Sequence, residues 1–146
     1  MSDEIKTRFN LTIKRFIPAP INAVFQLWTD PDLLIKWWGP PGVTCTEAMI
    51  DARAGGSYRI ANLLPTGTTL WIYGEFLTVD PPALLRYTWG IEPNVADETV
   101  TVTFVPVGEG TEVTVFHENA PDVASRDSHE NGWDGCLEKL VVVASY

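Results

Sequence analysis

The chain has 146 residues, of which 45% are hydrophobic, and a formal net charge of −9, as expected for one folded domain spanning 1–146. Its ten Lys and Arg residues are scattered rather than gathered in a stripe, which argues against nucleic acid and anionic membrane surfaces as partners. The longest aliphatic run, Leu140–Ala144, is far too short for membrane insertion.

The N-terminal part of the chain predicts a strand and then a short helix. The strand covers Phe9–Ile17 and ends at the Pro18-Ala19-Pro20 segment. Apolar residues then recur at the spacing of one helix face. These residues are Ile21, Val24, Phe25 and Trp28.

A second short helix should follow directly. Asp30 is a good N-cap, and Pro31 fits the first helical position because its missing N–H is not needed there. The helix stops at Gly39-Pro40. Since Trp37 and Trp38 lie where the helix ends at a rigid turn, we expect at least one side of them to be exposed to solvent.

Between Val43 and His117 the pattern changes to an alternation of apolar and polar residues with turn residues between the runs, which is typical of antiparallel strands. Short connections predict a meander, to which the N-terminal strand can add. The predicted strands are Val43–Asp51, Gly56–Leu63, Thr69–Val79, Leu84–Trp89, Thr99–Val105 and Thr111–His117.

From about Asp122 the chain predicts a long helix. Gly132 and Gly135 each cost roughly 1 kcal/mol in a helix interior, so we expect a close approach there or space beside Trp133. One face of this helix carries His129, Trp133, Cys136, Leu137, Leu140, Val141 and Ala144.

This order of elements predicts an α+β fold. The amphipathic last helix must bury its stripe against the concave face of one curved antiparallel sheet of about seven strands. The two short helices after the first strand would plug one end of the sheet.

Several short motifs in this order resemble one family. The family is the bacterial group homologous to the C-terminal domain of the activator of the heat-shock-protein ATPase, within the START-like (SRPBCC) helix-grip superfamily. The motifs are Thr29-Asp30-Pro31, Trp37-Trp38-Gly39-Pro40, Gly55-Gly56-x-Tyr58, Gly74 with Val79-Asp80-Pro81-Pro82, Tyr87-Thr88-Trp89, Glu98 through Val105, Gly110-Thr111 with His117, and His129-x-x-Gly132-Trp133 with Leu137 and Leu140.

The resemblance covers Phe9 to Val143 and implies the helix-grip fold, with a deep hydrophobic cavity between the sheet and the last helix. It implies little about activity, because fold does not fix function. The last helix stops at Tyr146, which is early for the group, so one end of the cavity should be more open.

An unusual number of aromatic residues supports a cavity. Six tryptophans in 146 residues exceed what one small core needs, although core packing is a sufficient reason to keep any single ring. Pockets are concave, mostly apolar and rich in aromatics. The residues that we expect to bind a ligand are Trp38, Tyr58, Trp71, Tyr73, Glu75, Trp89, His117, His129 and Trp133.

Three of these candidates depend on which face of the strand Thr69–Val79 points inward. One face carries Trp71, Tyr73 and Glu75, and the opposite face is also apolar, so the pattern leaves both orientations open. An inward Glu75 would have a pKa raised by desolvation and would be a candidate acid or base. The alternative is a glutamate on the convex face.

His117 and His129, the only two histidines, should lie near one mouth of the cavity, beside Trp38 and Trp133. A neutral imidazole there would hydrogen-bond the polar head of a ligand. The alternative is that each ring caps a nearby backbone group. Two histidines do not make a metal site and no third ligand has suitable spacing, so we expect no metal and no cofactor.

Binding of a small hydrophobic, aromatic or lipid-like molecule is therefore the function that the sequence favours. GxSxG, HExxH and Gly-rich phosphate motifs are absent, so no catalytic residue is assigned. One alternative is a cyclase-like or hydrolase-like enzyme that uses Glu75 or a histidine for proton transfer. The other is a stress-response module that acts like a co-chaperone on a partner ATPase, which the resemblance alone suggests.

The cellular location and the oligomeric state are expectations from short segments. Cys45 and Cys136 lack CxxC spacing, and residues 1–6 contain no apolar signal core, so a reducing cytoplasm is the simplest compartment. A homodimer through an exposed strand edge or through the Trp37-Trp38-Gly39-Pro40 turn is compatible with the sequence.

Overall fold

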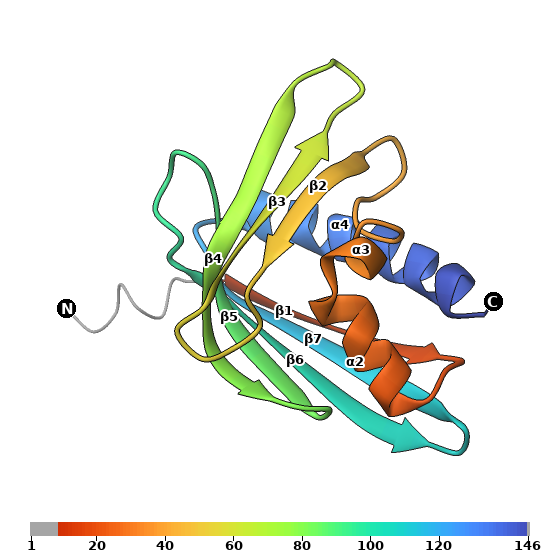
Figure 1. The fold of residues 1–146 in the computed structure, drawn as a ribbon. Helices are drawn as coiled ribbons and strands as arrows, with labels where there is room; N and C mark the ends of the chain where they lie inside the picture. Colours follow the sequence, from red (N-terminus) through yellow and green to blue (C-terminus); the bar gives the residue numbers. More distant parts are fainter. Residues whose placement is uncertain (1–8, 146) are drawn as a thin grey trace.

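Seven antiparallel strands form one curved sheet in the order β1-β7-β6-β5-β4-β3-β2 (Figure 1). The protein is described by a computed structural model, in which residues 9–145 are placed. The strands are β1 (Phe9–Ile17), β2 (Thr44–Ile50), β3 (Ser57–Leu63), β4 (Thr69–Asp80), β5 (Leu84–Ile91), β6 (Glu98–Val107) and β7 (Gly110–Ala120). The helices are α2 (Ile21–Thr29), α3 (Pro31–Leu34) and α4 (Val123–Ala144).

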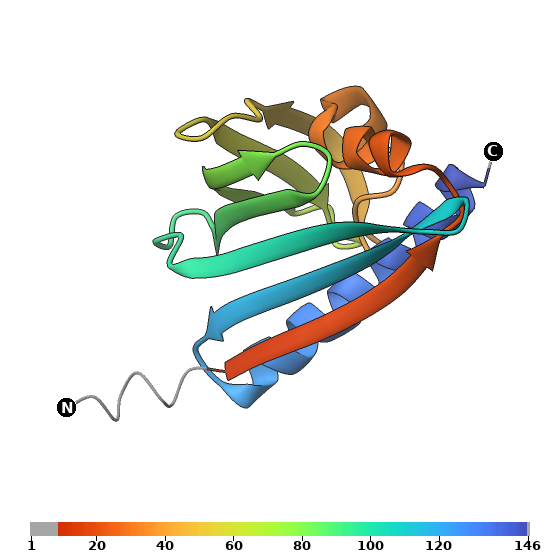
Figure 2. The same ribbon diagram turned by 90° about the horizontal axis from the view of Figure 1, so that it is seen from below.

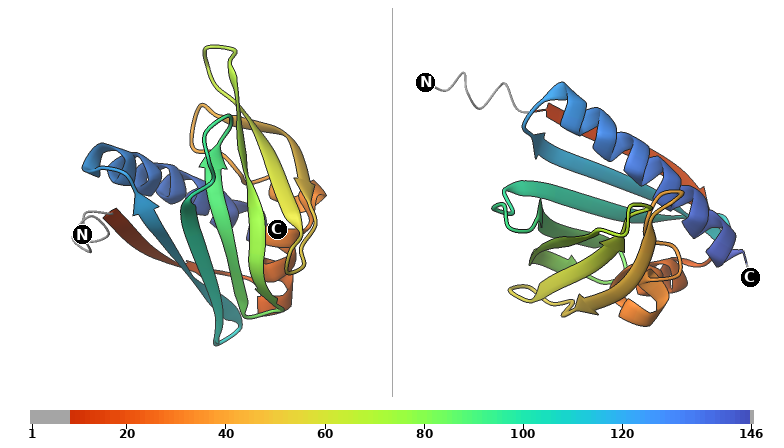
Figure 3. Two further views of the ribbon diagram at one scale, coloured as in Figure 1. Left: turned by 90° about the vertical axis from the view of Figure 1, so that its left-hand side faces the viewer. Right: turned by 90° about the horizontal axis from the view of Figure 1, so that it is seen from above.

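The long helix α4 lies along the side of the sheet formed by β1 and β7 (Figure 2; Figure 3, right). Its buried residues, Trp133, Cys136, Leu137 and Leu140, belong to the face that the sequence predicted. Helix α2 contacts β6 and β7 while α3 contacts β2, so the pair bridges the two arms of the curved sheet. The predicted α+β helix-grip fold is confirmed.

Helices α3 and α4 each begin at an aspartate whose side chain caps the first turn, as the sequence predicts for Asp30. The carboxylate of Asp30 accepts a hydrogen bond from the backbone N–H of Asp32 at 2.9 Å. That of Asp122 accepts one from the N–H of Ser125 at 2.7 Å. Each bond satisfies a donor that would otherwise be unpaired in the first turn.

The two tryptophans at the turn after α3 are buried, so the expectation that at least one side of them is exposed to solvent is wrong. Trp37 is 0% exposed and Trp38 is 5% exposed. The indole N–H of Trp37 donates to the carbonyl oxygen of Leu27 at 2.7 Å, and its ring lies 4.6 Å from that of Trp28. Because α3 folds back onto α2, these rings become the centre of the core rather than its edge.

The face of β4 that points inward is not the one that carries Trp71, Tyr73 and Glu75, so these three residues do not face the cavity as expected. Gly74 and Phe76 are buried, whereas Glu75 and Leu77 are exposed. The register shifts between Phe76 and Thr78, so a β-bulge changes the phase of the strand. Simple alternation cannot follow that change. It would place Val79 on the same face as Glu75, whereas Val79 packs against the core.

The two glycines in α4 have different reasons to be there. A Cβ atom on Gly135 would lie 2.8 Å from Cδ of Pro41 and 3.0 Å from Cβ of Pro40. The helix therefore touches the turn after α3 at this point, as expected from the close approach. A Cβ atom on Gly132 would meet no other atom within 4 Å, which leaves open space beside Trp133.

In the part of the chain that the structure describes, no helix combines the length and the apolarity needed to cross a membrane.

Alanine substitutions at the two glycines should have opposite effects on stability. Gly132→Ala should raise the free energy of unfolding by up to about 1 kcal/mol, because alanine is the better helix former. Gly135→Ala should lower it by about 1 kcal/mol, because overpacking against two rigid proline rings outweighs that gain. Urea unfolding at neutral pH measures both, and equal effects of the two variants would contradict this account of the packing.

Candidate functional site

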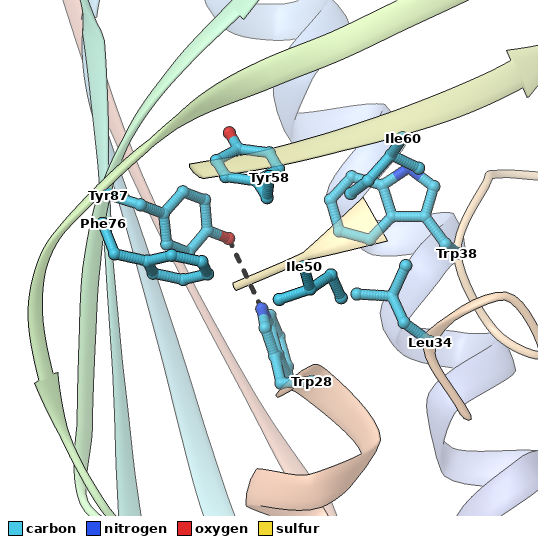
Figure 4. A pocket seen from close by; sticks show the side chains of 8 residues that line it. All are labelled: Trp28, Leu34, Trp38, Ile50, Tyr58, Ile60, Phe76 and Tyr87. Carbon is cyan, nitrogen blue, oxygen red and sulfur yellow. Dashed lines mark hydrogen bonds between the residues drawn. The ribbon is translucent and has the colours of Figure 1, made fainter. Parts of the chain in front are cut away.

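The centre of the molecule is filled by its own aromatic side chains. The gap left there is only about 10 Å³, room for a single water at most. Figure 4 shows Trp28 and Tyr87 meeting across it, where the indole N–H donates to the Tyr87 hydroxyl at 3.4 Å. Tyr58 closes another side, with its hydroxyl donating to the Thr88 carbonyl at 2.7 Å. The deep central cavity that the resemblance implies is therefore closed.

Two hollows remain at the other end of the concave face, near the first turns of α4. The inner cavity, of about 100 Å³, is lined by Trp38, Pro40, Asn62, Ile72, Trp89, Ser128, His129, Gly132, Trp133 and Cys136. The outer cavity, of about 370 Å³, is lined by Trp89, Gly90, Ile91, Asn94, Val95, Asp97, Glu98, Pro121, Ser125 and His129. Trp89 and His129 line both cavities, so the two hollows share a wall.

His129 of this shared wall belongs to a polar network of side chains from three elements. Glu98 opens β6, His117 stands near the end of β7, and His129 lies in the second turn of α4. The Nε2 atom of His117 is 2.9 Å from Oε1 of Glu98, and Nε2 of His129 is 2.9 Å from the same oxygen. The side chains of His117 and Glu98 are 0% and 12% exposed.

A hydrogen bond from Trp133 sets the protonation state of His117. The indole N–H of Trp133 donates to Nδ1 of His117 at 3.1 Å, and an indole can only donate. Nδ1 therefore carries no proton, so the proton of the neutral ring is on Nε2. Nε2–H then donates to Glu98, which completes a relay from Trp133 through His117 to the carboxylate.

His129 contacts the same carboxylate in a different way. Its ring stacks on that of His117, with centroids 4.6 Å apart and planes 17° apart. Although its Nε2 is 2.9 Å from Glu98, this buried atom makes no hydrogen bond to any residue between 9 and 145. The short distance therefore marks an electrostatic contact with poor hydrogen-bond geometry.

The network keeps Glu98 ionised. Burial alone would raise the pKa of its carboxyl group, but the hydrogen bond from His117 and the contact with His129 outweigh burial and lower it to about 2. Burial likewise lowers the pKa of His117 from 6.5, against the opposing effect of its hydrogen bond to Glu98. At neutral pH the site therefore holds a charged carboxylate next to a neutral imidazole.

The same three side chains have the composition of a metal site, because their ligand atoms lie within 4.8 Å of one another and two histidines with one carboxylate form a common metal-binding set. The structure thus supplies a third group that sequence spacing did not reveal. However, a metal on Nε2 of His117 would require the proton to move to Nδ1, which would face the indole N–H of Trp133. The arrangement fits a hydrogen-bond relay better than a metal centre.

Of the nine predicted binding residues, four line the inner cavity, Tyr58 and His117 lie elsewhere in the core, and three lie on the other face of β4. Trp38, Trp89, His129 and Trp133 line the inner cavity. Tyr58 lines the central gap, and His117 lies behind Glu98 rather than in a cavity wall.

The third group lies on the other face of β4 and lines neither cavity. Trp71 packs under the guanidinium of Arg59 at 3.7 Å from its ring centroid. The hydroxyl of Tyr73 donates to the carbonyl oxygen of Asn94. Glu75 is exposed, so the acid or base role considered for it has no buried environment to support it.

Glu98 is the site residue that the sequence reasoning missed. Val100, Val102 and Phe104 are buried on the inward face of β6, and they were recognised from their alternation. The same period of two, continued backwards by one step, places Glu98 on that face. A carboxylate in phase with three core residues was the signal, but the predicted strand began one residue too late to contain it.

Comparison with known proteins places this arrangement in a family. The family model described as Activator of Hsp90 ATPase homolog 1-like protein matches residues 18–145. No curated protein matches the chain at a comparable level.

Solved structures of bacterial proteins are similar over nearly the whole chain. A Chromobacterium violaceum protein is 28% identical with a TM-score of 0.83, covering 92% of this chain and 96% of its own. A protein from Silicibacter pomeroyi titled AHSA1 is 25% identical with a TM-score of 0.82, covering 92% and 96%. One from Nitrosomonas europaea is 25% identical with a TM-score of 0.81, covering 99% and 97%.

Acid should destabilise the fold through Glu98. Because its pKa of about 2 in the folded state lies below the ordinary value of 4.5, its contribution is complete above pH 4.5 and is lost as the pH falls towards 2. Between neutral pH and about pH 3, Glu98→Gln should lose about 2 kcal/mol less unfolding free energy than the wild type in urea titrations. Glu109→Gln, in the exposed β6–β7 turn, is the control, and identical pH profiles for all three proteins would refute the role of Glu98.

The protonation state of His117 can be read directly by ¹⁵N NMR of its ring nitrogens. We expect an unprotonated Nδ1 and a protonated Nε2, with a pKa below 6.5 because the ring is buried. Trp133→Phe removes the donor to Nδ1 and should let the other tautomer appear. Trp28→Phe, which removes a different indole N–H, should leave the His117 signals unchanged. A protonated Nδ1 in the wild type would contradict the relay.

Proposed function

The chain belongs to the family of Activator of Hsp90 ATPase homolog 1-like proteins, and from this premise we propose that it binds a small, flat hydrophobic molecule between the sheet and the first half of α4. The observation that carries this proposal is the inner cavity, whose wall contains Trp38, Trp89 and Trp133. Ligand pockets are mostly apolar and aromatic, with a few placed polar groups. Here the polar groups are Asn62, Ser128 and His129.

The tryptophans of this wall are held in place before any ligand arrives. The indole N–H of Trp38 donates to Oδ1 of Asn62 at 3.0 Å, and that of Trp133 donates to His117. The two rings meet edge to face, with centroids 5.5 Å apart. A site whose side chains are already ordered loses little entropy on binding.

The sizes of the cavities limit the ligand. An apolar cavity of about 150 Å³ binds benzene, so the inner cavity of about 100 Å³ accommodates one small ring with slight adjustment. The rest of a larger ligand would extend into the outer cavity of about 370 Å³. The outer cavity by itself lies within the range of about 300–1,000 Å³ that is typical of ligand pockets.

Binding without nucleophilic catalysis is favoured by the state of the thiol in the inner cavity. Burial raises the pKa of Cys136 to about 11, so it stays a protonated thiol at neutral pH. Since the thiolate is the reactive form, Cys136 acts as an apolar wall residue.

Titration with an environment-sensitive apolar dye, followed by displacement with small aromatic compounds, tests the proposal. We expect saturable binding to the wild type. Gly132→Leu should weaken it about tenfold or more, because Gly132 lines the inner cavity and a larger side chain there would fill the space of the ring. Gly132→Ala should weaken it much less.

The unfolding free energy of both variants, measured in urea, separates loss of the cavity from loss of the fold. Absence of saturable binding to the wild type would refute the proposed function. So would unchanged affinity in a folded Gly132→Leu variant.

A further inference from the structure

We propose that the ligand carries a protonated amine, held in the outer cavity next to Glu98 and Trp89, while its ring occupies the inner cavity. This inference rests on the proposed function and adds the chemical class of the ligand. It is carried by the charges around the outer cavity and by the way in which Glu98 is held.

The outer cavity is electrostatically suited to a cation. Of the described residues that line it, Asp97 and Glu98 are acidic and none is Lys or Arg. The N-terminus of α4 adds a positive dipole end at this place. That end is already occupied by Asp122, whose carboxylate accepts the N–H of Ser125 at 2.7 Å. Among the described residues that line the outer cavity, an anionic ligand would therefore meet two carboxylates and no Lys or Arg.

Of the described lining residues, His129 is the only one that carries an imidazole, and it already faces Glu98. Its Nε2 lies 2.9 Å from Oε1 of that carboxylate, and its ring is fixed between His117 and Trp89, with centroids 4.6 Å from each. The imidazole is therefore directed at the Glu98 carboxylate and is poorly placed to attract an anionic ligand as well.

Glu98 is held as a site residue would be. Burying a carboxylate is costly, and an apolar residue of similar size would often stabilise a fold equally well or better. Here the carboxylate is instead fixed by His117, which is oriented in turn by Trp133. Such support from behind is the arrangement that keeps a binding group in one position.

Trp89 supplies the second element of amine recognition. It is 7% exposed and belongs to the walls of both cavities. An ammonium group is attracted to the face of an indole, most strongly where water is excluded. In β5 and β6, Trp89 is the direct cross-strand partner of Glu98, so the ring and the carboxylate face the same small volume.

Three probes of nearly equal size test the charge preference in the unmodified protein. They are 2-phenylethylamine, the neutral 2-phenylethanol and the anionic 3-phenylpropanoate, each titrated by calorimetry at neutral pH and low salt. We expect the amine to bind at least about tenfold more tightly than the alcohol, and the carboxylate to bind most weakly.

The outcomes separate this inference from the proposed function. If the alcohol binds as tightly as the amine, or the carboxylate binds best, the amine proposal is overturned while ligand binding stands. If the apolar dye and all three probes fail to bind, the proposed function itself falls.

Glu98→Gln assigns the preference to one residue. The amide oxygen can still accept the hydrogen bond from His117, but the charge is gone. The variant should reduce the advantage of the amine over the alcohol to less than about threefold and leave the affinity for the alcohol within about twofold of wild type. Glu109→Gln removes an equal charge from an exposed turn and should leave the preference unchanged.

If Glu98→Gln does not fold, Asp97→Asn tests the same electrostatics at the exposed rim of the outer cavity. It should reduce the amine preference in the same direction by a smaller factor. An undiminished preference in a folded Glu98→Gln protein would overturn the assignment to this carboxylate.

Discussion

The hydrogen bond between the indole N–H of Trp133 and Nδ1 of His117 connects the last helix to the sheet at its most polar point. It fixes which nitrogen of His117 carries the proton, and through that proton it fixes Glu98. Three elements, α4, β7 and β6, are thereby joined through side chains that are almost fully buried. Because the indole can only donate and the carboxylate can only accept, one tautomer of the ring between them satisfies both.

The aromatic core explains where a ligand has room. Trp28 and Tyr87 hydrogen-bond to each other and Tyr58 hydrogen-bonds to the backbone, so these partly polar rings can fill the centre of the helix-grip fold. The inner cavity lies towards the start of α4, where Gly132 leaves the helix surface bare. Three residues later in α4, Gly135 has the opposite effect, because its missing side chain lets the loop after α3 pack directly against the helix. The same helix thus packs tightly at one glycine and leaves a cavity at the other.

Polar groups in a hydrophobic fold are most informative where they cost stability. Glu98 carries its charge with only 12% of its side chain exposed, and its pKa is held at about 2 by two imidazoles in spite of burial. An ion in this position is compatible with the fold only because every nearby ring is placed to support it. Glu98 lines the outer cavity beside the wall that the two cavities share, and this location links the energetics of the core to the proposed recognition of a ligand.

The sequence by itself determined the order of strands and helices, the buried face of α4 and the Asp30 cap of α3, because these follow from local periodicity and from a single side chain. Of the binding residues that it predicts, Trp38, Trp89, His129 and Trp133 line the inner cavity. Only the tertiary structure decided the facing of Trp71, Tyr73 and Glu75, because both faces of that strand carry large apolar side chains and alternation alone lets either face point inward. It alone brought Glu98 to His117 and His129, because the convergence of side chains from two strands and a helix depends on sheet register and helix docking, which no local pattern encodes.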